Sequence, residues 1–391
     1  MTVTSRGIGL LLAATALLAA GFAFGYPELT VVGTAAGAAI AFAAGYAAWR
    51  PRLEVNRSAD PDRVMRGDAS QVTLHVRNIS RIRGATLIAY DRCGSTAVPV
   101  PLLRLRAGSA TDAEYPVPTD RRGVVEIGPL RVVRRDPLGL LTLSHGHGGV
   151  SKVWVYPKVH PLTAVPAGIA RSLDGKVDRV PHGSITFDTL REYVVGDELR
   201  HVHWRTTARV GELMVREHVD TSLPRLVVLL DDRQEAHPDA GRGSESDGFE
   251  AACEAAASIV MSAFREELPV TLHLVSGGAA TGRATRPFLD LLAEAALHPP
   301  TATGPRRRDS LDLAIALLRH RKQGDTLIYL TGSGGAADIG RVGALRGAYP
   351  SIVAGTLGAT EDSPSTLDGL LVLAATDGPD FARSWDGVRA W

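Results

Sequence analysis

Two uninterrupted apolar runs open the chain. Residues 7–26 carry no charged side chain, and neither do residues 29–49. A helix of about 20 apolar residues is long enough to cross the hydrocarbon core of a bilayer. The few residues between the runs are too short for anything but a turn. The pattern predicts a transmembrane helical hairpin over residues 1–52, in contact with the lipid bilayer through residues 7–49.

The charges that flank these runs predict their orientation. Arg6 precedes the first run, Arg50 and Arg52 follow the second, and Glu28 lies in the connecting turn. Basic residues near the ends of spans stay on the cytoplasmic side. We therefore expect a multi-pass protein of a bacterial inner membrane, with its N-terminus and soluble domains in the cytoplasm. A cleaved signal peptide and a pair of buried helices are the alternatives; the immediate second run and the lack of a polar face favour the hairpin.

A different pattern follows, with short runs of alternating apolar and polar residues broken by turns. Residues 72–78 alternate strictly, and residues 85–91, 123–136 and 152–157 read in the same way. Arg66-Gly67-Asp68 and residues 136–139 supply turn chemistry. We interpret the Arg-Gly-Asp triplet as a turn and not as an adhesion motif. The spacing predicts an antiparallel, β-sandwich-like domain over residues 53–160.

Residues 224–391 alternate between continuous apolar strands and helical periods. The expected strands cover 224–232, 269–277, 325–332, 351–359 and 370–378; the expected helices cover 247–267, 288–297, 310–321, 336–348 and 380–391. Such alternation is typical of an α/β domain with a doubly wound parallel sheet, whose ligands bind at the carboxyl ends of the strands. With the hairpin and the β-rich domain, the chain is predicted to be multidomain.

Residues 183–218, the signature segment, separate these two regions and hold a dense mixture of charge and aromatic rings. Five arginines and six acids lie between Asp188 and Glu217. Near balance argues for paired groups and against a phosphate-binding stripe, and the formal charge of +1 for the whole chain gives no reason to expect nucleic acid as a partner. Two distant cysteines argue against a disulfide framework and favour a reducing compartment.

The signature segment resembles the domain-of-unknown-function-58 proteins, whose pattern is close to R-E-Y-x-x-G-D-x-x-R-x-I-H-W-x-x-[ST]-A-R followed by L-x-V-R-E. The matching residues are Arg191, Glu192, Tyr193, Gly196, Asp197, Arg200, His203, Trp204, Arg205, Arg209, Arg216 and Glu217. The resemblance implies a membrane-anchored bacterial protein with a von Willebrand factor A-like C-terminal domain. Such proteins are often encoded beside a MoxR-class AAA ATPase and transglutaminase-like membrane proteins. It implies no established activity.

In a von Willebrand A-type domain, an Asp-x-Ser-x-Ser loop after the first strand holds a divalent metal. The corresponding positions here are Asp231, Asp232, Arg233, Gln234 and Glu235. Arg233 and Glu235 replace the hydroxyl residues, and an arginine beside a hard cation is electrostatically unfavourable. We therefore expect no metal and no other cofactor, with Asp231, Asp232 and Glu235 as degenerate candidates.

Residues 161–223 are predicted to form a connector followed by the signature segment. We expect a short helix over 198–209, a strand over 211–219, and Trp204 anchored in a hydrophobic seat. The arginines are expected to bond Glu192, Asp197 or Glu217. Two roles are open for this network: an ion-pair clasp between domains, or a docking surface for a protein partner.

Catalysis has little support in the sequence. His203 with Ser184 or Thr206 and Asp197 could supply base, nucleophile and orienting group, but no G-x-S-x-G elbow accompanies them. His201 and His203 lack companions for zinc, and no P-loop occurs. The sequence predicts a membrane-anchored, non-enzymatic scaffold that docks a cytoplasmic partner such as a MoxR-class AAA ATPase in cell-envelope processes. The alternatives are an envelope-related hydrolase using His203 and a metal-dependent protein-binding module.

Overall fold

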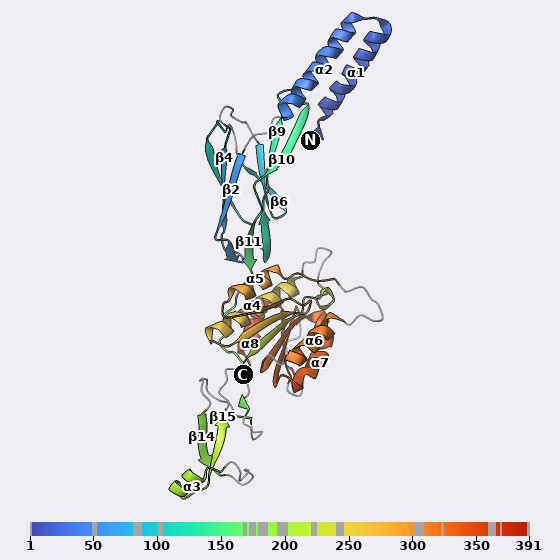
Figure 1. The fold of residues 1–391 in the computed structure, drawn as a ribbon. Helices are drawn as coiled ribbons and strands as arrows, with labels where there is room; N and C mark the ends of the chain where they lie inside the picture. Colours follow the sequence, from blue (N-terminus) through green and yellow to red (C-terminus); the bar gives the residue numbers. More distant parts are fainter. Residues whose placement is uncertain are drawn as a thin grey trace. The chain divides into compact units, whose positions relative to one another are not determined.

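The computed structural model describes residues 2–48, 53–80, 88–100, 105–166, 170–171, 177–178, 187–193, 202–219, 225–239, 246–299, 309–321, 324–358, 365–367 and 370–388 (Figure 1). The chain divides into two compact units, Met1–Val155 and Tyr156–Trp391.

The first unit begins with two antiparallel apolar helices, α1 (Ser5–Phe24) and α2 (Pro27–Ala48). Both are long and apolar enough to cross a membrane. Small residues let the two helices pack closely: a Cβ added to Gly33 would lie 2.7 Å from the Leu18 side chain, and one on Gly21 would lie 2.6 Å from Thr30. Gly25, in the left-handed region with φ of 69°, ends α1 and permits the tight reversal.

Two antiparallel sheets form the rest of this unit, which confirms the strand-rich region. The smaller sheet has the order β2 (Leu53–Asp60), β4 (Gln71–Asn78), β7 (Ala110–Pro116). The larger has the order β1 (Thr2–Val3), β10 (Leu141–His147), β9 (Leu130–Arg135), β5 (Ile88–Cys93), β8 (Gly123–Ile127), β11 (Ser151–Tyr156), β3 (Arg63–Met65), and β6 (Thr96–Val100) pairs with β5.

The two sheets share one core. Alternate residues of β4 (Val72, Leu74 and Val76) pack in the same buried cluster as Ile127 and Leu130 of the larger sheet. The single run expected at 123–136 is wrong, because β8 and β9 are separate strands. Gly128, with φ of 95°, and the following proline, which cannot donate to a ladder, break the run.

A buried ion pair also joins these sheets. The Arg57 guanidinium of β2 donates two bonds to the Asp91 carboxylate of β5, at 2.8 and 3.0 Å, and both side chains are almost fully buried. Tyr115 of β7 donates to the same carboxylate at 2.7 Å. Burial and the bond to Asp91 raise the pKa of Tyr115 well above its ordinary value, so this hydroxyl stays a donor.

The second unit is built on a mainly parallel sheet, which confirms the predicted α/β region. Its strand order is β18 (Ala279–Thr281), β17 (Val270–Leu274), β16 (Leu226–Leu230), β19 (Thr326–Gly332), β20 (Ser351–Leu357), β22 (Leu370–Ala375), β21 (Ser365–Leu367). The five central strands are parallel, and the edge strands β18 and β21 are antiparallel to their neighbours. The sequence missed both edge strands, since three residues carry no periodicity.

Helices cover both faces of this sheet. α4 (Asp247–Arg265) is buried along most of its length, α5 (Arg286–Glu294) contacts it, and α8 (Gly378–Asp386) lies against it (Figure 1). On the other face of the sheet, α6 (Ser310–Arg321) and α7 (Ile339–Gly343) share a hydrophobic core with Val227 and Leu229 of β16. The single helix expected at 336–348 is wrong, because three glycines interrupt that range. It is replaced by η3 (Ser333–Asp338), α7 and η4 (Ala344–Gly347).

The segment just after β11 lies against the helices of the second unit. Trp385 of α8 donates from its indole nitrogen to the Ala164 carbonyl at 2.7 Å, and Tyr156 donates to Asp290 of α5 at 2.6 Å. His160 contacts Glu254 of α4 at 2.8 Å. The last residues of the predicted 53–160 domain and Ala164 of the predicted connector are therefore held by hydrogen bonds to α4, α5 and α8. Two short pairs of strands follow: β12 (Ala170–Arg171) with β13 (Val177–Asp178), and β14 (Phe187–Glu192) with β15 (Met214–Val219).

Candidate functional site

The carboxyl edge of the parallel sheet carries a buried pair of acids. β16 ends at Leu230, and Asp231 and Asp232 follow directly, both fully buried. β16 lies between β17 and β19, and chain connections leave it in opposite directions on the two sides. Ligands of doubly wound sheets bind at such a switch point. These two carboxylates therefore occupy the position where the fold favours a site.

Arg233 fills the space beside Asp231. Its guanidinium donates from Nε to one Asp231 oxygen at 2.9 Å and from a terminal nitrogen to the other at 2.8 Å, a bidentate ion pair. The Arg233 side chain is 7% exposed and the Asp231 side chain is fully buried. The remaining donors reach Glu235 at 3.0 Å and Asp338 at 2.7 Å. The guanidinium is thus surrounded by carboxylates, as a bound cation would be.

Two hydroxyls complete the shell of Asp231. Tyr329 donates to it at 2.6 Å and Thr331 at 2.9 Å, both from β19. Burial alone would lower the pKa of Arg233, but its bonds to Asp231 and the charge of that carboxylate outweigh burial and raise it. Burial and the charge of the neighbouring Asp231 carboxylate also raise the pKa of the Tyr329 hydroxyl. Arg233 therefore stays charged and Tyr329 stays protonated at any physiological pH.

A second arginine extends the network toward the surface. Arg341 of α7 donates to Asp338 at 2.8 Å, to Asp309 at 3.0 Å and to Asp312 at 2.6 Å. Burial alone would raise the pKa of Asp338, but its bonds to Arg233 and Arg341 lower it. Sequence reasoning missed Asp309, Asp338 and Arg341, because they lie on loops and helices remote from Asp231 in the sequence.

Asp232 points to different partners. One of its oxygens accepts from the Ser276 backbone N–H at 2.9 Å. The other has no hydrogen-bond partner among the described residues, although the His298 ring nitrogen lies 3.3 Å away. Burial raises the pKa of Asp232. The three metal candidates do not converge: Asp231 and Glu235 contact Arg233, and Asp232 faces Ser276 and His298. No metal-binding group of three His, Cys, Asp or Glu side chains occurs within the described ranges.

Glycines allow the loop after β19 to press against this network. A Cβ on Gly332 would lie 2.2 Å from the Ala236 carbonyl oxygen of η2 (Gln234–Ala236), and one on Gly335 would lie 1.9 Å from the Thr331 hydroxyl. The run Thr331-Gly332-Ser333-Gly334-Gly335 thus lets the chain after β19 approach the residues that follow Arg233, and this dense run of glycines is a sequence signal for such a close approach.

The signature segment folds as a two-stranded arm, β14–α3–β15, hereafter the signature arm. β14 and β15 pair antiparallel, with Arg191 opposite Val215 and Glu192 opposite Met214. The helix α3 (Trp204–Val210) is shorter than the expected 198–209 and begins six residues later. His203 is its N-cap: its ring nitrogen accepts from the Thr206 backbone N–H at 3.3 Å and contacts the Thr206 hydroxyl at 2.7 Å.

The expected seat for Trp204 is wrong. Its side chain is 64% exposed, and α3 has no buried residue. A seven-residue helix on a two-stranded sheet has too little apolar surface opposite it to cover an indole. Val202 and Val215, which form a bridge and are buried, are the small core of the arm.

The other signature residues are described to different degrees. Arg205 and Arg209 are exposed on α3, and Glu192 and Tyr193 lie at the end of β14. Only the backbone is described for Arg191, Arg216 and Glu217, whereas Gly196, Asp197 and Arg200 lie outside the described residues, as do Ser184 and His201. The predicted bonds to Glu192, Asp197 or Glu217 therefore stay a prediction.

Comparisons with known structures give only remote likenesses. A CARDB domain from Pyrococcus furiosus, solved in complex with di-metal ions, is 19% identical over 27% of this chain and 91% of its own length, with a TM-score of 0.20. A β-glucosidase from Listeria innocua is 17% identical over 27% and 16%, with a TM-score of 0.15. Cwp6 from Clostridium difficile is 10% identical over 78% and 37%, with a TM-score of 0.17. These scores are too low to support any argument.

The sequence comparison is informative for the region that carries both the signature arm and the Asp231 network. No curated protein matches the chain. The sequence profile of the family described as "Protein of unknown function DUF58" matches residues 189–330, from within β14 to Leu330 of β19. Over these residues, the match confirms the resemblance to the DUF58 family that was drawn from the signature segment.

Proposed function

We propose that this protein is a membrane-anchored, non-enzymatic scaffold that docks a protein partner through its signature arm. The observation that carries the proposal is the exposure of α3: the helix has no buried residue, and Trp204 is 64% exposed beside Arg205 and Arg209. Tryptophan and arginine are the residue types that dominate binding energy at protein interfaces. A two-stranded hairpin with this surface gains stability when a partner covers it.

The Asp231 network supports a binding module over an enzyme. Read from β18, the six strands to β22 have the sequence order 3-2-1-4-5-6, with the third antiparallel. This order supports the von Willebrand A-like fold that the family resemblance implies. At the position that a metal would take in such a fold, Arg233 is held by Asp231, Glu235 and Asp338. The proposed module therefore carries a fixed cation of its own and works without metal.

The anchor in this proposal is the pair of apolar helices. Basic residues outside both ends and Glu28 in the turn support an orientation in which the termini of the hairpin face the cytoplasm. The partner proposed on family resemblance is a MoxR-class AAA ATPase, with a transglutaminase-like membrane protein as a further component. Nucleic acid is not proposed as a partner.

Co-purification tests this proposal. Full-length protein is extracted in mild detergent from its own membranes, and proteins that it retains are identified by mass spectrometry. We expect an AAA ATPase with the wild type and at least a tenfold loss with Trp204→Ala or with Arg205→Ala/Arg209→Ala, since each removes hot-spot side chains. Arg383→Ala, an equally exposed arginine on α8, is the control and should retain the partner. An ATPase retained equally by all four proteins would overturn the assignment of the arm.

A further inference from the structure

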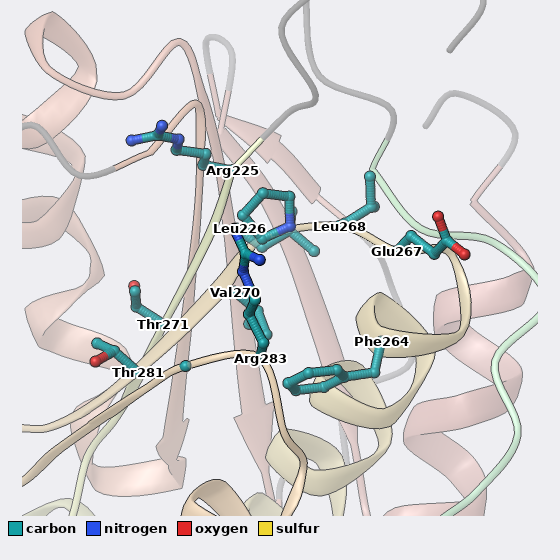
Figure 2. A pocket seen from close by; sticks show the side chains of 11 residues that line it. Arg225, Leu226, Phe264, Glu267, Leu268, Val270, Thr271, Thr281 and Arg283 are labelled. Atoms are coloured by element: carbon teal, nitrogen blue, oxygen red, sulfur yellow. The ribbon is translucent and has the colours of Figure 1, made fainter. Parts of the chain in front are cut away.

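A cavity opens at the end of the parallel sheet that lies opposite Asp231. The cavity has a volume of about 880 Å³ and lies where β16 and β17 begin. Its walls come from the end of α4, the turn before β17, and the edge strand β18 with the residues after it (Figure 2). This volume is within the range of pockets that hold a small molecule or a short peptide.

The floor of the cavity is apolar. Leu226, Leu268 and Val270 are buried, and the Phe264 ring is half-buried, edge-to-face with Phe288 at 5.4 Å between ring centroids. Phe264 is thus fixed by a second ring and does not depend on a ligand for its position. An apolar side chain that enters the cavity would remove its own surface and the exposed part of the Phe264 ring from water. This burial is the main favourable term in such binding.

Two arginines stand over this floor. Arg225 and Arg283 line the cavity and are exposed, and neither guanidinium has a hydrogen-bond or ion-pair partner among the described residues. In Figure 2, Arg225 and Glu267 stand at opposite sides of the row of labelled side chains, with Arg283 between them in this view. Elsewhere in this unit, Arg233 and Arg341 are each saturated by carboxylates. Within the part of the chain that the structure describes, the two arginines of the cavity therefore offer unused donors.

The charge of the lining limits what can bind. Two arginines and Glu267 give a net charge of +1, which matches one carboxylate better than a dianionic phosphate or a polyanion. Glu267 adds an acceptor that can take a backbone N–H. It has φ of 56°, in the left-handed region where glycine is usual. This conformation belongs to the turn that ends α4, and it holds the Glu267 carboxylate at the rim of the cavity.

We infer that this cavity binds a short peptide segment of a partner protein, with an apolar side chain on the floor and an acidic residue against Arg225 and Arg283. The carboxylate would accept charge-assisted bonds from the guanidinium groups, and Glu267 would accept from the peptide backbone. The cavity is at the opposite end of the sheet from Asp231 and uses no residue of the signature arm. The inference therefore stands apart from the proposed function and can fail without it.

The probe is a blocked, fluorescein-labelled hexapeptide with two leucines and one aspartate, titrated with full-length protein in detergent micelles. Anisotropy gives the affinity. We expect the aspartate peptide to bind at least tenfold more tightly than its asparagine or serine-for-leucine counterparts. Arg225→Gln and Arg283→Gln should each weaken binding about tenfold, since each removes charge-assisted bonds. Arg286→Gln, which removes the same charge from a neighbouring exposed arginine outside the cavity, should change affinity less than about twofold.

Four results would overturn the inference. One is equal affinity for the aspartate and asparagine peptides, and another is unchanged binding in both arginine variants. The third uses vesicles: if phosphatidylglycerol vesicles bind through Arg225 and Arg283 and displace the peptide, while phosphatidylcholine vesicles do not, the ligand is a membrane surface. Self-association that Arg283→Gln abolishes, measured by light scattering without peptide, would instead assign the cavity to a second copy of this chain.

Discussion

Replacing Arg233 tests whether its guanidinium stands in for a metal ion. Arg233→Met keeps much of the side-chain volume but removes every side-chain bond from residue 233 to Asp231, Glu235 and Asp338. Breaking a buried ion pair by removing one partner costs about 3–5 kcal/mol, because the other charge stays buried. Asp231 keeps the hydroxyl donors of Tyr329 and Thr331, so we expect the lower end, about 3 kcal/mol. For a unit of this size that lowers the melting temperature by about 6–12 °C.

Arg233→Ser goes one step further and empties the space between the carboxylates. Asp231, Glu235 and Asp338 would then surround an opening with a hydroxyl in it, and oxygen ligands of this kind suit Mg²⁺ or Mn²⁺. We expect millimolar MgCl₂ or MnCl₂ to raise the melting temperature of Arg233→Ser, by about 2.7 kcal/mol of stabilisation at a hundredfold excess over the dissociation constant. Thermal unfolding of the full-length protein in detergent, followed by tryptophan fluorescence, measures both effects.

Arg233→Met is the matched control, since its side chain fills the opening and offers no oxygen. The wild type and Arg233→Met should not respond to the metals, and EDTA should reverse the response of Arg233→Ser. A loss below about 1 kcal/mol in Arg233→Met would show that the pair is not a buried structural contact. A wild type stabilised by MgCl₂ as strongly as Arg233→Ser would refute the view that the arginine occupies the cation position.

Three further predictions concern single side chains. Because burial raises the pKa of Asp232 above 3.8, its ionised form costs stability as pH rises from that value; Asp232→Asn should be about 1 kcal/mol more stable than wild type at pH 7 with no advantage near pH 3.5, by urea unfolding at both pH values, and an equal advantage at both would contradict this cause. Glu267→Gly should stabilise the protein by about 0.5–1 kcal/mol, since glycine adopts φ of 56° without strain, and Glu266→Gly is the control, which should destabilise. His203→Ala should cost the arm about 1 kcal/mol through loss of the N-cap, read by amide hydrogen exchange in α3, whereas loss of an enzymatic activity with α3 exchange unchanged would revive the hydrolase alternative.

Much of the fold follows from local patterns in the sequence. Continuous apolar runs such as β16 and β19 are too short for a buried helix and therefore indicate buried strands. The helix α4 has a helical period together with the Ser246 cap that accepts from Phe249. The same reasoning failed where a strand was too short to show a pattern, and where one apolar run contained two strands. β18 and β21 are too short to show a period, and the run at 123–136 holds two strands because Gly128 and Pro129 interrupt it.

The candidate site was only half accessible to such reasoning. The position of Asp231 after the first parallel strand, and the poor fit of Arg233 beside a metal, could be recognised from adjacent residues. The partners of Arg233 could not: Asp309 precedes α6 and Asp338 ends η3, and each approaches only because the sheet brings their loops to one edge. The sequence does not show which loops meet in the folded protein. The carboxylates that bind Arg233 could therefore be identified only from the three-dimensional structure.

The balance of acidic and basic residues in the signature segment predicted ion pairs there. Among the described residues, buried ion pairs of arginine with aspartate lie instead in the two sheet domains. The buried ion pairs that the structure describes are Arg57 with Asp91 and Arg233 with Asp231, each inside a sheet domain that can exclude water on all sides. Among the side chains of the arm that the structure describes, Val202 and Val215 are the buried ones, and α3 holds Trp204, Arg205 and Arg209 in solvent. A charged and aromatic surface that its own domain cannot bury gains most from a partner. The same composition that suggested an internal clasp therefore supports an external interface once the size of the supporting sheet is known.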